Sequence, residues 1–108
     1  MCIFCEIIKG NIKSEILFED DKFIVIKDIE PKAKYHYLAI PKNHYKLLSE
    51  QTSADIENLG YILNKIPSLS ELLHLENGYR LIINQGEDAG QTVHHLHIHI
   101  LAGEKLDF

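Results

Sequence analysis

Residues 93–101 read Val93-His94-His95-Leu96-His97-Ile98-His99-Ile100-Leu101. From residue 95 onward histidines alternate strictly with apolar residues, and a β-strand sends successive side chains to opposite faces. We therefore predict a strand over residues 95–101 whose apolar face is anchored on the core. The same parity places His94 with the apolar set, outside the cluster. The predicted cluster on the other face consists of His95, His97 and His99.

Three imidazoles in line have two reasonable chemical uses. They can ligate a metal, since imidazole is a common nitrogen ligand of zinc. Alternatively, one ring acts as nucleophile or base while its neighbours orient it and hold an anion. An ordinary pKa of about 6.5 suits each ring to either part near neutral pH. A merely solvated sheet face would explain the spacing but not the choice of residue.

Composition narrows the class of protein. The chain has 108 residues, 45% of them hydrophobic and 25% charged, which predicts one globular domain spanning residues 1–108. No apolar run approaches the ~20 residues needed to cross a bilayer. The formal charge of −5 argues against nucleic acid binding. Two cysteines are too few for the disulfide framework of a small secreted protein. From these features together we expect a cytoplasmic protein without membrane or nucleic acid partners.

Hydrophobic periodicity predicts an α+β fold, with a five-stranded antiparallel sheet, one main helix and a short N-terminal helix. Apolar residues over 53–66 follow the helical period, and Thr52-x-x-Asp55 resembles a capping box. The strands come as hairpin-like neighbours with one main helix between the third and the fourth, which favours an antiparallel sheet over a doubly wound one. The short helix is expected at residues 3–9, and the strands at 16–18, 23–26, 37–40, 79–83 and 95–101.

The histidine pattern resembles the signature of the histidine triad (HIT) family, His-φ-His-φ-His-φ-φ with φ apolar. The nearest branch is similar to the small Hint-type and bacterial Hit-type nucleotide hydrolases or transferases. The resemblance implies a HIT-like fold and a homodimer formed through the helix at 53–66 and the edge strand at 79–83. It covers nearly the whole chain and includes Gly90-Gln91-Thr92-Val93, Asn84, Lys27-Asp28-Ile29, Tyr35-His36-Tyr37 and Ile40-Pro41-Lys42-Asn43-His44.

The resemblance also implies a mechanism. His97 would attack the α-phosphorus of a purine nucleoside 5′-phosphoramidate or a related nucleotide, dinucleoside polyphosphates included, and form a covalent nucleotidyl-histidine. His99 and the backbone around Gln91 and Thr92 would stabilise charge on the phosphoryl oxygens. Thr92 or His99 would pass a proton to the leaving group. His36 would support the triad from the neighbouring strand.

Further residues match the family's substrate site. Asp28 matches a carboxylate that binds the ribose hydroxyls, although an isolated Asp beside a strand end also fits a turn. Asn84 would hold the phosphate or the leaving group, and Asn also favours turns. Five apolar residues fall where the family lines its purine pocket, where any apolar residue also fits the core. Ile26 fits the core better than the pocket. The five are Ile3, Phe4, Ile7, Ile26 and Ile29.

The two cysteines stand in Cys2-Ile3-Phe4-Cys5, the C-x-x-C spacing of half a zinc site. A tetrahedral site needs two further ligands, for which His44 and His95 are the candidates. Some bacterial proteins similar to this one carry zinc on such a set, so the resemblance implies a structural zinc. Simple reduced cysteines or a redox pair remain the alternative.

Two other functions fit the same residues. A metallohydrolase would hold zinc on His95, His97 and His99 and use a bound water as its nucleophile. A nucleotide-binding regulatory module would keep the triad with little turnover. Turnover that survives chelation would favour histidine chemistry over the metallohydrolase. Nucleotide binding without hydrolysis would favour the regulatory module.

Overall fold

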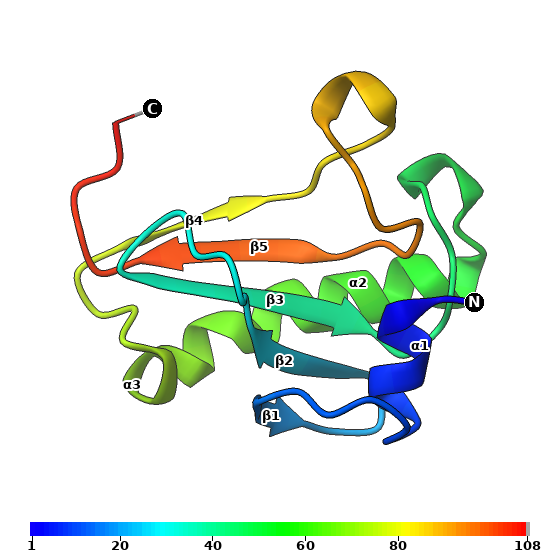
Figure 1. Cartoon of the computed structure of the whole chain (residues 1–108), viewed down its shortest axis with the longest axis horizontal. Helices are drawn as coiled ribbons and strands as arrows, with labels where there is room; N and C mark the ends of the chain where they lie inside the picture. Colours follow the sequence, from blue (N-terminus) through cyan, green and yellow to red (C-terminus); the bar gives the residue numbers. More distant parts are fainter. Residues whose placement is uncertain (108) are drawn as a thin grey trace.

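The computed structural model describes residues 1–107, and its β-strands form one antiparallel sheet in the order β1-β2-β3-β5-β4 (Figure 1). This confirms the predicted fold class. Within the described residues no helix is long and apolar enough to cross a membrane. The strands are β1 Ile16–Glu19, β2 Phe23–Lys27, β3 Tyr35–Pro41, β4 Tyr79–Ile82 and β5 Ile98–Ala102, and the α-helices are α1 Ile3–Ile8, α2 Ser53–Lys65 and α3 Ser70–Leu73.

A capping box marks the start of helix α2, and a proline follows its end. The Thr52 hydroxyl accepts a hydrogen bond from the Asp55 amide at 3.1 Å, and the Asp55 carboxylate accepts one from the Thr52 amide at 3.0 Å. This is the expected capping box, and it satisfies two amides that a helix start leaves without intrahelical partners. Pro67 then stands in the first turn of a 3₁₀ helix, Ile66–Leu69, that joins α2 to α3.

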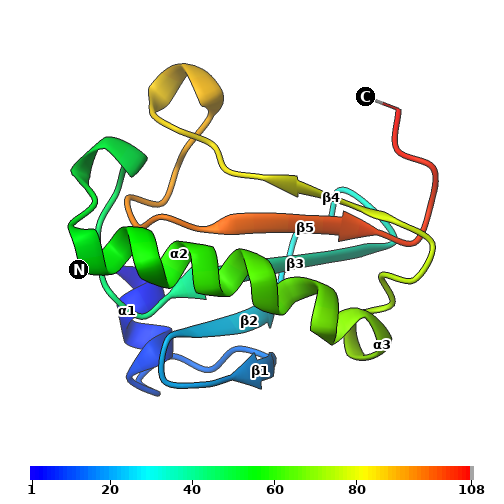
Figure 2. The same cartoon turned by 180° about the vertical axis from the view of Figure 1, so that it is seen from behind.

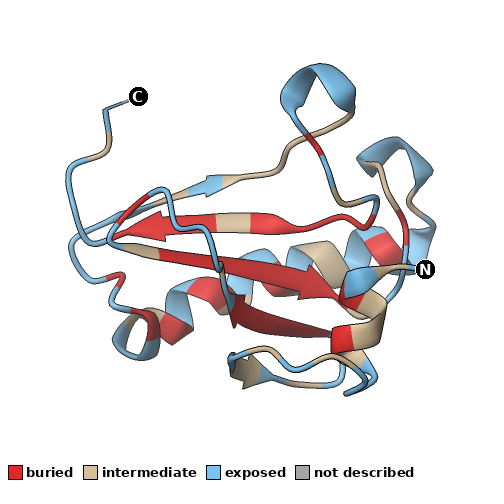
Figure 3. Cartoon of the chain, in the orientation of Figure 1, coloured by how far each residue is buried: buried red, intermediate tan, exposed pale blue. Residues whose placement is uncertain are grey.

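The two faces of the sheet carry separate cores. Phe23 and Val25 of β2 pack with α2, whereas Ile24 and Ile26 pack with Phe4 of α1. Figures 1 and 2 show α1 and α2 on opposite sides of the sheet, and Figure 3 shows burial concentrated in the three central strands. Strand alternation therefore assigns each side chain of the central strands to one of the two layers.

The alternation in β5 places the histidine-bearing face on the α1 side. Ile98 and Ile100 belong to the core under α2, so the odd-numbered neighbour His99 faces the α1 layer. In β3, Leu38 belongs to the α1 core, and His36 shares its parity. The register pairs Leu38 with His99, which brings the two strands' histidines together.

Strand β5 begins at Ile98, three residues later than predicted. Ala39 pairs with Ile98, so the continuing register would set Leu96 opposite Pro41, which has no amide hydrogen to donate. The Leu96 amide instead donates to the carbonyl of Tyr45 at 2.7 Å. Placing His94 on the apolar face was therefore wrong, because the alternation is not regular there and the side chain is exposed.

Candidate active site and metal centre

His97 lies just before β5 with only 8% of its surface exposed. Its Nδ1 is 2.8 Å from the carbonyl oxygen of His95. Since a carbonyl only accepts hydrogen bonds, Nδ1 carries the proton and donates it, which leaves an unprotonated lone pair on Nε2. His97 therefore has the tautomer that a nucleophilic imidazole requires.

A chain of hydrogen bonds fixes the next two rings. The Lys32 amide donates to Nδ1 of His36 at 2.9 Å, so the proton of neutral His36 must be on Nε2. That nitrogen lies 2.9 Å from Nδ1 of His99 and 3.3 Å from Oδ2 of Asp28. When His36 donates to His99, the proton of His99 lies on Nε2. His99 is then a hydrogen-bond donor beside His97, with ring centroids 5.1 Å apart.

Burial keeps these rings neutral. The pKa of His99 is lowered from 6.5 to about 4, mainly by desolvation and also by the neighbouring His97 and His36 rings, against an opposing effect of Asp28. Desolvation also lowers the pKa of His36, although the Asp28 carboxylate opposes it. The neutral tautomers of His36 and His99 derived from the hydrogen bonds are therefore the forms present near neutral pH.

The third histidine of the triad turns away from the other two. His95 is fully buried, and its Nε2 donates to the carbonyl of Pro41 at 2.7 Å. Its free Nδ1 faces three possible metal ligands. These are Cys2 Sγ at 3.4 Å, Cys5 Sγ at 3.6 Å and His44 Nδ1 at 3.2 Å.

This four-residue cluster has the dimensions of a tetrahedral zinc site. Zinc bonds of ~2.3 Å to sulfur and ~2.05 Å to nitrogen put tetrahedral ligands about 3.5 Å apart for S–N pairs and about 3.3 Å apart for N–N pairs. Three of the sulfur–nitrogen distances are 3.3 to 3.6 Å, the nitrogen–nitrogen distance is 3.2 Å, and all four ligand atoms lie within 4.8 Å of one another. The bond from His95 to Pro41 is the outer contact that orients a ligating imidazole. The residues present therefore fit zinc.

A second convergent group does not suit a metal. The ligand atoms of Asp28, His36 and His99 lie within 4.8 Å of one another. A metal on Nε2 of His36 would need the proton on Nδ1, where the Lys32 amide already donates. This group is therefore held together by hydrogen bonds.

The residues of the Gly-Gln-Thr segment have different environments. Gln91 is buried, accepts from the Gly86 amide at 2.8 Å and donates to the Lys46 carbonyl at 3.1 Å. Its side chain therefore braces the loop. Thr92 is exposed, and Asn84 is half-buried.

The expected purine-pocket residues divide in two. Phe4 and Ile7 are buried in the core under α1, as the alternative interpretation allows. Ile3 is 44% exposed and Ile29 is 92% exposed. Phe4 also meets the edges of the His95 and His97 rings, a contact that sequence reasoning missed, since an apolar residue between two cysteines gives no signal of it.

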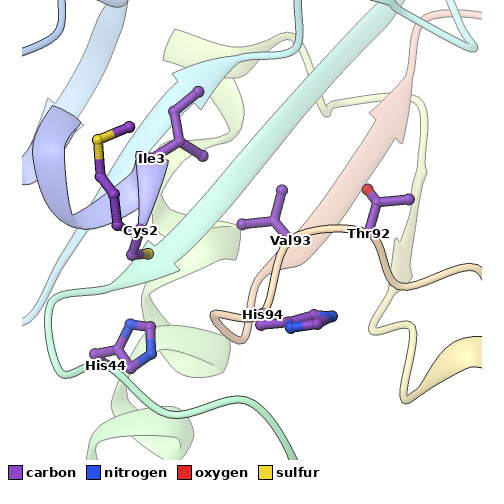
Figure 4. Close-up of a pocket in the computed structure, with 7 residues that line it drawn as sticks. Cys2, Ile3, His44, Thr92, Val93 and His94 are labelled. Carbon is purple, nitrogen blue, oxygen red and sulfur yellow. The ribbon is translucent and has the colours of Figure 1, made fainter.

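A cleft of about 510 Å³ opens beside the metal cluster. Figure 4 shows Cys2 and His44 on one side of it, and Thr92, Val93 and His94 on the other. Met1 and Ile3 complete its lining.

The fold and the site together define a class of protein: a small antiparallel sheet carries several histidines, and hydrogen bonds to backbone groups orient their rings. A family model described as "Scavenger mRNA decapping enzyme C-term binding" matches residues 1–106. An uncharacterized HIT-like protein of Chlamydia muridarum is 45% identical over 101 residues, covering 94% of this chain and 80% of the relative. The chain therefore belongs to this family of domains and to the histidine triad proteins.

Solved structures agree with this assignment. A protein named HIT family hydrolase from Legionella pneumophila superposes with a TM-score of 0.93 at 37% identity, covering 100% of this chain and 97% of that one. A zinc-bound histidine triad family protein from Mycobacterium smegmatis gives a TM-score of 0.81 at 33% identity, covering 99% and 80%.

The lowered pKa of His99 predicts how stability depends on pH. Between 6.5 and about 4 the unfolded chain binds a proton that the native ring excludes, so the free energy of unfolding falls as pH drops through this window. We expect His99→Asn to flatten this dependence, measured by urea unfolding above and below the window. An unchanged slope in the variant would show that His99 is not the group responsible.

Proposed function

We propose that the protein is a hydrolase or transferase of purine nucleoside 5′-phosphoryl compounds that acts through a covalent intermediate on His97. The hydrogen bond from His97 Nδ1 to the His95 carbonyl carries this proposal, because it leaves Nε2 unprotonated. The Legionella relative named a HIT family hydrolase supports it. Substrates would be phosphoramidates such as adenosine 5′-phosphoramidate, or dinucleoside polyphosphates.

The reaction would proceed in two displacements. The lone pair on His97 Nε2 forms a bond to the α-phosphorus as the bond to the leaving group breaks. The leaving group takes a proton from Thr92 or His99. Water then attacks the phosphorus as the bond from phosphorus to His97 Nε2 breaks, and the proton that the water loses replaces the one that Thr92 or His99 gave up. The Nε2–H of His99 stabilises the negative charge that develops on the phosphoryl oxygens. In the structure His99 is already held in this donor form by His36.

Asp28 is our candidate for ribose recognition. One carboxylate oxygen, Oδ1, accepts from the Glu30 amide at 2.8 Å, which fixes the side chain in a turn. The other oxygen, Oδ2, lies 3.3 Å from His36 Nε2, and the side chain is 17% exposed. A sugar hydroxyl bound to Oδ2 would leave the His36 proton to His99 alone. Ribose binding and charge stabilisation would thus reinforce each other.

The geometry disfavours a metallohydrolase on the triad. His95 directs Nδ1 toward the cysteines and commits Nε2 to Pro41, and His97 commits Nδ1 to the backbone. Among the described residues, the groups whose ligand atoms converge do not include the three triad histidines together. We therefore assign zinc to Cys2, Cys5, His44 and His95, where four protein ligands would make the site structural. In the cytoplasm, reduced cysteines would be available for this purpose.

We further propose a homodimer formed through β4 and α2. Tyr79 and Leu81 of the edge strand β4 are each 36% exposed. They pair with Ala102 and Ile100, which face α2, so their side chains lie on the α2 side of the sheet. On α2, Ile56 and Leu63 are 60% and 38% exposed, and their spacing of seven places them on one helix face. A second copy would cover these apolar side chains.

His97→Ala should lose turnover of adenosine 5′-phosphoramidate by roughly 10⁴-fold or more, because the covalent route is removed. AMP release measures this, and calorimetry should show nucleotide binding comparable to the parent protein. The matched control is His74→Asn, an exposed histidine at the end of α3 whose left-handed backbone suits Asn. Near-normal turnover by His97→Ala would rule out the nucleophile assignment.

The purified protein should contain one zinc per chain, measured by metal analysis. Cys5→Ala should remove it, because three remaining ligands hold the ion less tightly. Turnover by the parent protein should survive a brief chelator treatment that leaves this site loaded. Native protein without zinc, or zinc retained fully by the variant, would contradict the site.

Leu81→Glu should convert the dimer to a monomer in sedimentation velocity, because it puts a charge into the proposed interface. Ile16→Glu is the matched control, since Ile16 is 41% exposed on β1 at the opposite edge of the sheet. A monomeric parent protein, or dissociation caused equally by both changes, would refute this interface.

A further inference from the structure

His95 belongs to the metal cluster and to the active site at once. Its imidazole Nδ1 lies within 3.6 Å of all three other members of the cluster. Its backbone carbonyl accepts the hydrogen bond that sets the tautomer of His97. The residue is fully buried, so the ring cannot shift without displacing its surroundings. Any change that moves the His95 ring therefore also acts on the carbonyl that holds His97.

Phe4 provides a second physical link between the same two places. It stands between Cys2 and Cys5 on α1 and is only 6% exposed. Its ring meets the His95 ring at a centroid distance of 5.8 Å and the His97 ring at 5.1 Å, both edge to face. Edge-to-face pairs at such distances are attractive and directional. The position of α1 thus determines how firmly the His97 ring is held.

Helix α1 is anchored on the sheet by the buried side chains of Phe4 and Ile7, and both cysteines stand at its N-terminal end. It has six residues, far fewer than an isolated helix needs to be stable. Its N-cap is Cys2, whose sulfur accepts from the Cys5 amide at 3.4 Å. A metal on both cysteines would join this helix to His44 after β3 and to His95 before β5.

We propose that zinc on Cys2, Cys5, His44 and His95 positions the nucleophile His97, with His95 and Phe4 as positioning residues. The inference rests on the proposed function of His97 and adds a control over it. Loss of the metal releases the cysteine end of α1 and the His95 ring, loosens the Phe4 contact and allows His97 to leave its Nδ1–H tautomer. Cys2 and His44 also line the cleft, so the same loss would alter the cleft wall.

The test compares the His97 ring in zinc-loaded and zinc-depleted protein by long-range ¹H–¹⁵N correlation, which distinguishes imidazole tautomers. The loaded protein should show the single Nδ1–H form, and depletion should give a mixture that added zinc reverses. In parallel, kcat/KM for adenosine 5′-phosphoramidate should fall about tenfold or more on depletion, a common size for coupling between sites. The fall should lie mainly in kcat.

Two variant pairs separate metal control from simple loss of structure. Cys5→His keeps four zinc-type ligands and should retain the Nδ1–H tautomer, whereas Cys5→Ala should lose it. Phe4→Leu should keep zinc but weaken the restraint on the His97 ring. Ile8→Val changes a partly buried residue of the same helix and should leave that restraint intact. Thermal unfolding checks that each variant is folded at the assay temperature.

An identical His97 spectrum with and without zinc would overturn the coupling, as would failure to bind zinc at all. The spectrum decides this even for a protein that does not hydrolyse the phosphoramidate, so failure of the proposed function is recognised separately. Conversely, good turnover that is indifferent to zinc would preserve the function and remove the control.

Discussion

The hydrogen bond from His95 Nε2 to the Pro41 carbonyl joins the end of β3 to the segment before β5. Pro41 cannot donate an amide hydrogen, so the sheet ladder stops there, and its carbonyl is available to a side chain. The bond turns the other nitrogen of His95 toward the cysteines, and the carbonyl of His95 in turn orients His97. The proposed zinc site and the proposed nucleophile His97 thus both depend on this contact.

Backbone groups fix the tautomer of three neighbouring rings. The Pro41 carbonyl, the His95 carbonyl and the Lys32 amide each leave their histidine one possible neutral form. Such partners do not titrate, and they do not depend on side-chain rotamers. The four histidines therefore present different nitrogen atoms to their surroundings, as the different roles that we propose for them require: a metal ligand, a nucleophile, a hydrogen-bond donor and the support of that donor.

Much of this arrangement follows from the sequence pattern. The hairpin-like order of the apolar runs predicted the antiparallel sheet. Strand parity placed His95, His97 and His99 on one face, but the structure turns the His95 ring toward the cysteines. The pattern could not show that β5 starts at Ile98, because this depends on Pro41 in a strand distant in sequence. Nor could it distinguish pocket from core at Phe4 and Ile7, since burial needs only an apolar side chain and the contact with His97 needs the whole fold. The family resemblance gave the backbone around Gln91 a part in charge stabilisation. The hydrogen bonds by which its side chain braces the loop could be found only from the three-dimensional structure.

The order in which the cluster is assembled has a consequence for biosynthesis. Cys2 and His95 stand 93 residues apart, so the ribosome adds His95 to the chain long after the two cysteines. At synthesis rates of about 5–20 residues per second, the thiols wait roughly 5 to 20 seconds before the set can close. During that interval the nascent chain has both cysteines but lacks His95, so the proposed four-ligand zinc site is incomplete. The thiols are then open to oxidation or to binding another metal. The chain thus depends on a reducing environment most strongly before it has folded.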